Sequence, residues 1–537
     1  MLKKIVALLL ALIMCAGILA GCGGNGGTTV KPSGDVQLGG DSENPLFAKV
    51  TDIELYTVAD SNYDLEGTYL DKLLLAQENI NLNITEGFDM QQMLIDHDLP
   101  DIVRMNANMW GNEYGPKGAF VNILDYLDEM PNLKAVLEAN PEAVEYYLAA
   151  DGGLYHIPNI VEGNSVPYAF IYREDIFEKH NLTFPTTRDE FVAVLRKLKE
   201  LYPNSYPFTM RQMEGNMQGL MYLCMGFGTS MALTGSTQTV MDFDHNTGTW
   251  YHGPTSDGMK DMVTFLHQLY EEGLLHKSVI TMTPAQWVEC FIKGDNATGA
   301  SFIGFDKMDR IPAELQPSGE ELNPEFRLAA GAPIQFSESG VGATYEDGAT
   351  SYNFLISADS DNLDAALAYI DWLYSEEGVR TINWGKEGET FEFDADGNEK
   401  WLDSLKEETD PQFSRGLGMP GFYGVRDFDA YLGWQTEKHK ANLELANSYA
   451  TLPARPSLVY NSDEQAIYDT YSQSLYGYVR GEIQAFITGE RDLAEWDAYV
   501  AFAESDKYQF DRLMKIHEDA YERMQNNKVD INELLNP

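Results

Sequence analysis

Ile53-Glu54-Leu55-Tyr56-Thr57-Val58-Ala59 alternates apolar and polar side chains, and Asp60-Ser61-Asn62-Tyr63 ends the alternation with turn-forming residues. This pattern predicts a β-strand with one buried face. A helical pattern follows over residues 67–79, residues 80–85 alternate again, and residues 99–104 are a short apolar run. Strands that alternate with helices indicate an α/β fold with a mostly parallel sheet covered by helices.

Ligands of such sheets bind beyond the carboxyl ends of the strands. The turn that holds Tyr63 and the loop that holds Trp110 follow two of these strands, so both are expected on one rim. Further along, residues 169–173 predict a strand and residues 174–180 a short helix. Thr187 begins another helix, and Glu190 stands three residues later, as a capping box requires.

Composition and charge restrict the function. The chain has 537 residues, enough for two lobes, and 44% of them are hydrophobic, as in a globular protein. Asp and Glu number 84 against 37 Lys and Arg, so the formal net charge is −47. Such a surface repels nucleic acid, anionic lipid and polyanionic ligands, but it does not discriminate among neutral ligands.

The amino terminus has the pattern of an export signal. Lys3 and Lys4 precede an apolar run over residues 5–18, which is too short for a comfortable membrane span. Leu19-Ala20-Gly21-Cys22 follows and resembles the bacterial lipobox. The resemblance implies a signal peptide over residues 1–21, cleavage before Cys22, and diacylglycerol and palmitate on that cysteine. The alternative is an ordinary signal cut nearby. Residues 22–43 are rich in small and polar residues, which predicts a flexible tether.

Cysteine usage excludes a disulfide framework. Beyond Cys15 in the signal and Cys22, the chain has only Cys224 and Cys290. They can form one disulfide or remain two buried thiols, and we favour the thiols.

No catalytic or cofactor motif is complete. Residues 416–421 have the glycine spacing of a dinucleotide turn, but Pro420 interrupts the helix that should begin there. His517 and Glu518 begin a zinc-protease helix, but Tyr521 stands where the second histidine ligand is needed. A nucleophile elbow and a phosphate loop are absent from the sequence. We therefore expect no enzyme activity, no cofactor and no metal.

The aromatic residues point to a sugar ligand. Sugar rings lay their C–H faces against indole and phenol rings, while polar side chains bind their hydroxyls. Trp110, Trp384 and Trp434 lie in predicted loops, so with Tyr63 they are candidate stacking surfaces, although structural packing is the alternative for each tryptophan. Two polar candidates join them. Arg173 can equally be a buried salt bridge, and Asp306 follows the predicted strand over residues 300–305.

Five segments resemble sequence blocks of the extracellular solute-binding lipoproteins (family 1 type) that serve carbohydrate ABC transporters, in their larger Gram-positive form. They occur in the family's order: Asp151-Gly152-Gly153-Leu154-Tyr155-His156-Ile157-Pro158, Arg173-Glu174-Asp175 with Pro185-Thr186-Thr187-Arg188-Asp189-Glu190-Phe191, Tyr369-Ile370-Asp371-Trp372-Leu373-Tyr374-Ser375-Glu376-Glu377-Gly378, Trp384-Gly385-Lys386-Glu387-Gly388-Glu389-Thr390-Phe391, and Glu495-Trp496-Asp497-Ala498-Tyr499-Val500.

The resemblance implies a two-lobe periplasmic-binding-protein fold of type II topology, with a cleft between the lobes and more than one crossover. We expect lobe one over residues 44–162 plus 328–385, and lobe two over residues 163–327 plus 386–537. Relatives often carry a calcium loop after the helix that Thr187 begins, but residues 202–207 hold no carboxylates, so no metal is carried over.

The resemblance further implies a monomeric receptor, lipid-anchored on the extracellular face of the cell membrane. It would capture an oligosaccharide or other uncharged glycan fragment and deliver it to the permease subunits of an ABC importer. Two other functions remain open. A peptide receptor would need an acidic site for an amino terminus. A surface glycosidase would need two facing carboxylates.

Overall fold

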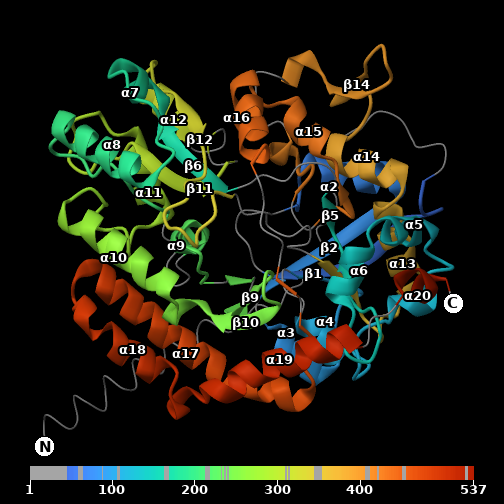
Figure 1. The fold of residues 1–537 in the computed structure, drawn as a ribbon. Helices are drawn as coiled ribbons and strands as arrows, with labels where there is room; N and C mark the ends of the chain where they lie inside the picture. Colours follow the sequence, from blue (N-terminus) through green and yellow to red (C-terminus); the bar gives the residue numbers. More distant parts are fainter. Residues whose placement is uncertain are drawn as a thin grey trace, which may run out of the picture.

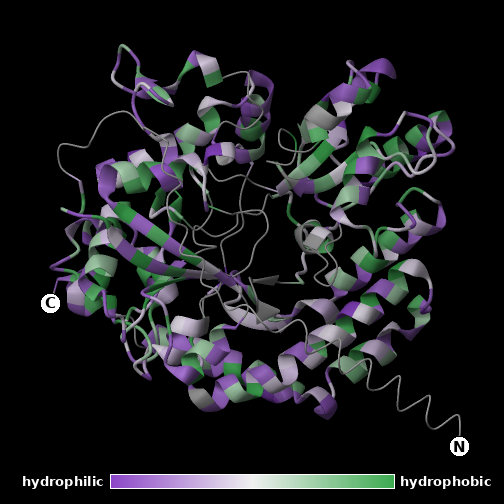
Figure 2. Cartoon of the chain, turned by 180° about the vertical axis from the view of Figure 1, so that it is seen from behind, coloured by the Kyte–Doolittle hydropathy of each residue, from purple (hydrophilic) through white to green (hydrophobic). Residues whose placement is uncertain are grey.

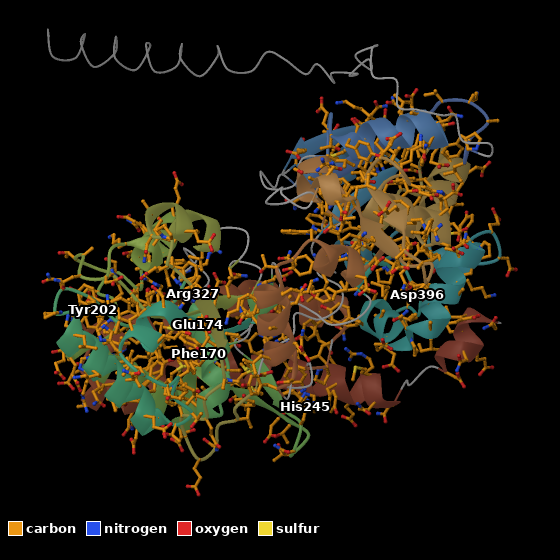
Figure 3. All side chains as sticks on the ribbon, turned by 90° about the horizontal axis from the view of Figure 1, so that it is seen from above. Phe170, Glu174, Tyr202, His245, Arg327 and Asp396 are labelled. Atoms are coloured by element: carbon orange, nitrogen blue, oxygen red, sulfur yellow. The ribbon has the colours of Figure 1, made fainter. Side chains whose placement is uncertain are left out.

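The computed structural model describes residues 45–536, except for residues 59–64, 88, 106–108, 162–167, 212–217, 232, 235–236, 239–240, 309–310, 312–314, 344–352, 406–411, 420–421, 450–454, 457 and 527–529. Two bodies lie side by side (Figure 3), with Phe170, Glu174, Tyr202 and Arg327 in one and Asp396 in the other. Each body contains its own main sheet.

The first lobe is built on a five-stranded sheet in the order β2-β1-β3-β13-β4. β1 pairs in parallel with β2 and β3, whereas β13 is antiparallel to both β3 and β4. The strands are β1 (Thr51–Val58), β2 (Ile80–Gly87), β3 (Ile102–Met105), β4 (Ile157–Pro158) and β13 (Asn353–Ile356). This order, with one antiparallel strand that returns from the other lobe, is the expected type II topology.

β1 lies between β2 and β3, and several of its apolar side chains are buried. Ile53 and Leu55 are buried in the first-lobe core, while Tyr56 is buried in a second cluster. Between β1 and β2 the chain forms α2 (Tyr69–Leu73), which Thr68 caps, and a π-helical turn over Leu74–Glu78. The helices α5 (Pro131–Ala139), α6 (Pro141–Tyr147) and α13 (Leu363–Leu373) complete the core.

The second lobe surrounds an antiparallel sheet in the order β11-β6-β12. Its strands are β6 (Tyr168–Arg173), β11 (Ile303–Lys307) and β12 (Leu328–Gly331). The helices α7 (Glu174–Lys179), α8 (Arg188–Leu201) and α11 (Pro284–Ile292) lie beside the sheet (Figure 1). Further from it, α10 (Asp257–Glu271) packs on α17 (Ser462–Thr488), which in turn contacts α18 (Trp496–Ala503) and α19 (Phe510–Asn526). Figure 2 shows purple and green alternating along the outer helices, as expected of helices with one buried face. Among the described residues, no helix combines the length and hydropathy that a membrane crossing requires.

The helix α8 begins as the sequence predicts, with one difference. The Thr187 side chain accepts a hydrogen bond from the Glu190 backbone N–H. The Glu190 carboxylate reaches one residue further back and binds the N–H and the hydroxyl of Thr186. In a capping box Glu190 would bind the backbone N–H of Thr187, whereas here it binds Thr186.

The chain passes between the lobes several times. β5 (Ile160–Val161) leads from the first sheet toward β6, and the chain returns between β12 and β13. Near the carboxyl terminus, α19 packs in the second-lobe core, whereas α20 (Ile531–Leu535) packs on α5 and α6 of the first lobe (Figure 1). The expected multiple crossovers are confirmed.

The lobes divide the chain at other residues than we expected. β12 pairs with β6 of the second lobe, although residues from 328 on were expected in lobe one. The first-lobe core includes Trp401 and Ala430, as well as Leu535 from α20, although residues from 386 on were expected in lobe two. The hairpin of β14 (Phe391–Phe393) and β15 (Glu399–Trp401) packs there because the Trp401 ring lies against the Trp384 ring, with centroids 4.9 Å apart.

Candidate functional site

The candidate site is the region where the two sheets face the crossing segments. β1 and β3 end at the same edge of the first sheet, and the antiparallel β13 begins there. β5 leaves this edge toward the start of β6, where Asp306 of β11 pairs with Ala169. The carboxyl edge of the first sheet and the edge of the second sheet where β6 begins therefore lie at the two ends of the same connecting segment.

A buried polar layer lies beneath the edge of the first sheet. The Arg104 guanidinium donates to the Thr57 hydroxyl at 2.5 Å and lies over the Phe422 ring at 4.6 Å. His156 Nδ1 and Asn353 Oδ1 are 2.8 Å apart, and both residues are fully buried. Because Arg104 and His156 draw partners from several segments, they fix the geometry of this edge.

Trp110 lies at this edge, half-buried. Its ring stacks on Tyr114, with centroids 5.5 Å apart and planes 23° apart. We expected a loop here, and that is wrong: Trp110 lies in α4 (Met109–Tyr114). This helix packs closely against His156: a Cβ on Gly111 would lie 2.4 Å from His156 Nε2. The other residue expected on this rim, Tyr63, lies outside the described residues, as does Cys22.

Asp306 and Arg211 form the polar pair of the second lobe. Arg211 Nη1 lies 3.2 Å from Asp306 Oδ2, and both side chains are largely buried. The Arg211 Nε is buried with no hydrogen-bond partner. Asp306 lies within β11 rather than after it, since that strand extends to Lys307.

Arg173 occupies an internal ion-pair network. Its guanidinium binds the Asp175 carboxylate at 2.9 and 2.7 Å, the Phe291 carbonyl at 3.0 Å, and Asp295 at 3.2 Å. It also stacks over the Phe326 ring at 4.5 Å, and the residue is 1% exposed. The structure therefore favours the buried salt bridge, which is one of the two alternatives that the sequence left open.

The two remaining tryptophans differ in burial. Trp384 is the last residue of α14 (Glu376–Trp384), and it is 2% exposed. Its Nε1 donates to Asp427 at 2.6 Å, so the expectation of an exposed loop indole is wrong for this residue. Trp434 follows α15 (Phe428–Gly433) and is half-buried, with its ring packed against the cores of both lobes.

The two cysteines outside the amino-terminal region form no disulfide. Cys224 and Cys290 are free, buried thiols, as favoured from the sequence, and burial raises the pKa of Cys290 to about 11. No group of three or more His, Cys, Asp or Glu in the described part of the chain is placed to hold a metal ion.

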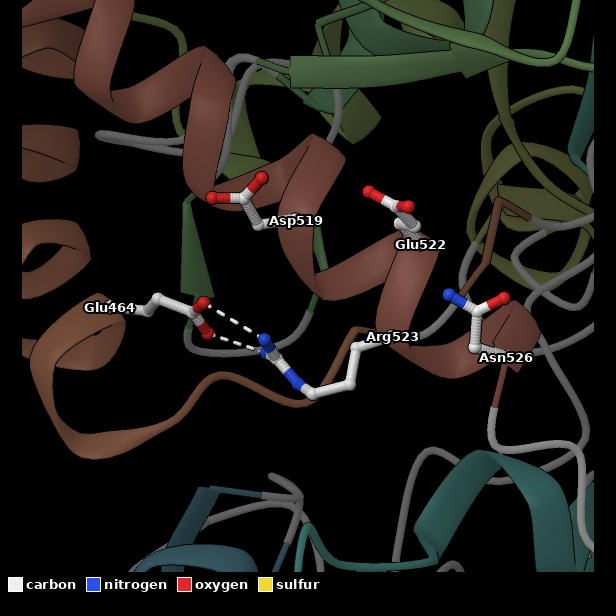
Figure 4. A pocket seen from close by; sticks show the side chains of 5 residues that line it. All are labelled: Glu464, Asp519, Glu522, Arg523 and Asn526. Atoms are coloured by element: carbon white, nitrogen blue, oxygen red, sulfur yellow. Dashed lines mark hydrogen bonds and ion pairs between the residues drawn. The ribbon is translucent and has the colours of Figure 1, made fainter.

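An open pocket of about 440 Å³ lies on α19 (Figure 4) and is lined by Glu464, Asp519, Glu522, Arg523 and Asn526. The Arg523 guanidinium is already bound by both oxygens of Glu464. The same arginine also donates to the Val459 carbonyl. We interpret the ion pair of Arg523 with Glu464 as a structural contact that holds the start of α17 on α19.

Sequence reasoning missed several polar residues of the site. Arg104 is a charged residue at the end of a short buried strand, which is a readable signal. Asn353 and His156 come together only through the pairing of β13 with β4, and no local pattern shows this contact.

The family model for bacterial extracellular solute-binding proteins matches residues 65–380, more than half of the chain. The chain belongs to this family. It is 24% identical over 492 residues to the fructooligosaccharide ABC transporter substrate-binding protein FusA of Streptococcus pneumoniae, covering 84% of this chain and 83% of that protein. It is 23% identical over 418 residues to lipoprotein LipO of Bacillus subtilis, covering 71% and 73%.

Several solved structures share the fold. The alginate-binding protein AlgQ2, solved without calcium ion, superposes with a TM-score of 0.72 at 22% identity and covers 90% of this chain and all of its own. FusA of S. pneumoniae in complex with kestose gives a TM-score of 0.69 at 20% identity, covering 89% and 100%. The fold expected from the sequence, a two-lobe α/β solute-binding protein, is confirmed.

Proposed function

We propose that this solute-binding protein captures an oligosaccharide or other uncharged glycan fragment between its lobes and delivers it to the permease of an ABC importer. The observation that carries the proposal is the pairing of Trp110 on Tyr114 at the carboxyl edge of the first sheet, beside a layer of polar side chains. A half-buried indole that is held by a neighbouring ring suits the C–H face of a sugar.

The names of a sequence relative and of a structural neighbour support a sugar rather than a peptide. FusA is named for fructooligosaccharides, and AlgQ2 for alginate. The net charge of −47 disfavours a polyanion such as alginate for this chain, which favours a neutral glycan. We propose Trp110 and Trp434 as stacking surfaces, and Asp306 with Arg211 as hydroxyl partners from the second lobe. Tyr63 remains a candidate on the same rim.

Calorimetric titration of the mature protein tests the ligand class. Neutral oligosaccharides, with fructooligosaccharides among them, are expected to bind, whereas peptides of similar mass are not. Trp110→Leu is expected to weaken glycan binding about tenfold or more, which corresponds to about 1.4 kcal/mol. Phe393→Leu, which changes an aromatic residue that is 40% exposed on β14, is the matched control and should bind normally.

Two outcomes would contradict the proposal. Binding of peptides in place of glycans would show a peptide receptor. Release of shorter sugars from a bound glycan over hours would show a glycosidase, the other function that the sequence left open.

The anchor is part of the same proposal. LipO is named a lipoprotein, which supports the interpretation of Leu19 to Cys22 as a lipobox. Signal cleavage and acylation at Cys22 would hold the receptor on the outer face of the membrane, where its concentration near the permease is raised. Cys22→Ser is expected to release the protein into the medium with unchanged glycan affinity. Retention of this variant in the membrane fraction would refute acylation as the anchor.

A further inference from the structure

A single segment of the chain, residues 425–447, packs against both lobes. β16 (Val425–Arg426) pairs with β5 at the point where the chain leaves the first lobe. In α15, Ala430 lies in the first-lobe core, whereas Tyr431 lies in the second-lobe core. The following α16 (Glu437–Asn447) packs on β12 (Figure 1). Side chains of this segment therefore sit where the lobes meet.

Within residues 425–435 of this segment, three side chains have buried polar atoms that no protein group binds. Gln435 is 5% exposed, and neither its amide nitrogen nor its amide oxygen has a partner. Trp434 Nε1 is buried without an acceptor, and so is Arg426 Nε. Buried polar groups in folded proteins are nearly always paired, so three such groups within ten residues need an explanation.

The Tyr431 ring contacts both the Arg426 guanidinium and the Trp434 ring. The Arg426 guanidinium lies 5.2 Å over the Tyr431 ring. The Tyr431 ring in turn meets Trp434 edge to face, with centroids 6.0 Å apart and planes at 83°. Arg426 makes no ion pair with any carboxylate in the described part of the chain, although acids outnumber bases more than twofold.

Resting on the proposed function, we propose that Arg426, Trp434 and Gln435 form a donor-rich subsite for one neutral sugar ring of the bound glycan. Trp434 packs against the C–H face of the ring. Arg426 and Gln435 donate N–H groups to adjacent hydroxyl oxygens, and the Gln435 oxygen accepts from one hydroxyl. The ligand group that matches this subsite is an uncharged sugar ring with hydroxyls on adjacent carbons. Because the segment contacts both lobes, a ring bound here also joins them.

Gln435→Leu separates a ligand contact from a structural role. Leucine keeps most of the side-chain volume and removes an unpaired buried amide, so the melting temperature of the free protein should stay the same or rise. Affinity for the neutral oligosaccharide should fall about tenfold. A purely structural glutamine would move stability and affinity in the same direction.

Arg426→Gln provides the second test, with Arg480→Gln as its matched control. Arg480 makes a similar cation–π contact, 5.8 Å from the Tyr476 ring on α17. Calorimetry should show about tenfold weaker glycan binding for Arg426→Gln and wild-type affinity for Arg480→Gln. Trp434→Leu should resemble Arg426→Gln.

The outcomes distinguish this inference from the proposed function. If all three variants bind as tightly as wild type while Trp110→Leu binds weakly, the subsite is refuted and the receptor function stands. If wild type binds no glycan, both are refuted. If wild type prefers a uronic-acid oligosaccharide to the neutral one, and Arg426→Gln removes that preference, the neutral assignment is wrong.

Discussion

Replacing Arg173 with methionine should destabilise the second lobe and leave glycan affinity unchanged. The substitution removes both hydrogen bonds to Asp175, whose side chain is 9% exposed, and leaves that carboxylate without a countercharge. Asp295 loses less, because Lys179 still lies 3.0 Å from it. Removing one partner of a buried ion pair costs about 3–5 kcal/mol, so the free energy of unfolding should fall by about this amount.

Urea unfolding followed by circular dichroism measures the loss in the free energy of unfolding. Two further variants serve as controls. Arg196→Met removes an equally short bidentate pair with Glu272, but at the surface, and should cost only about 0–1 kcal/mol. The double variant Arg173→Met with Asp175→Leu should recover part of the stability, because the uncompensated charge is gone. A loss below about 1 kcal/mol for Arg173→Met, or weakened glycan binding with unchanged stability, would refute a structural role for Arg173.

Three further predictions concern stability. Asp371→Ala should cost about 1–3 kcal/mol in urea unfolding, because its carboxylate accepts the N–H groups of Asn132 and Leu133 at the start of α5; wild-type stability would contradict this. Burial lowers the pKa of His517 from 6.5 to about 4, so below pH 6.5 the unfolded chain binds a proton that the folded chain does not. The urea concentration at the unfolding midpoint should therefore decrease as the pH is lowered from 6.5 to 4. His517→Gln should make this dependence on pH weaker, and an equal dependence in both proteins would exclude His517 as its cause. Trp384→Leu should cost about 2–4 kcal/mol by thermal or urea unfolding, since it leaves a buried site partly empty and removes a hydrogen bond to Asp427 Oδ2. A Tm equal to wild type would contradict its place in the core.

The local elements were largely predictable because their side chains carry the pattern. The alternation around Leu55 predicts β1, and Thr187 marks the start of α8. The helix around Trp110 was missed because Gly111, Asn112 and the asparagines before it are weak helix formers. His156, which is distant in sequence, packs so close to Gly111 that a Cβ there would clash, and no local pattern shows this requirement.

The arrangement of elements was less predictable. Nothing in residues 328–331 indicates that they pair with β6, since four small and apolar residues suit either sheet. The burial of Trp384 depends on Asp427 and Trp401, which follow it in the chain by 43 and 17 positions. The unpaired amide of Gln435 has no sequence signal at all, because a glutamine before a helix is ordinarily read as a surface residue.

The position of α20 has a consequence for how the protein is made. Ile531 and Leu535 fill the first-lobe core against α5 and α6, and Asn536 donates to Glu138. A chain that emerges from its amino terminus exposes Leu133 and Tyr147 long before these last residues arrive. The core of the first lobe is therefore complete only after residue 535 has been synthesised, and a truncation at residue 526 should leave α5 and α6 sensitive to proteases.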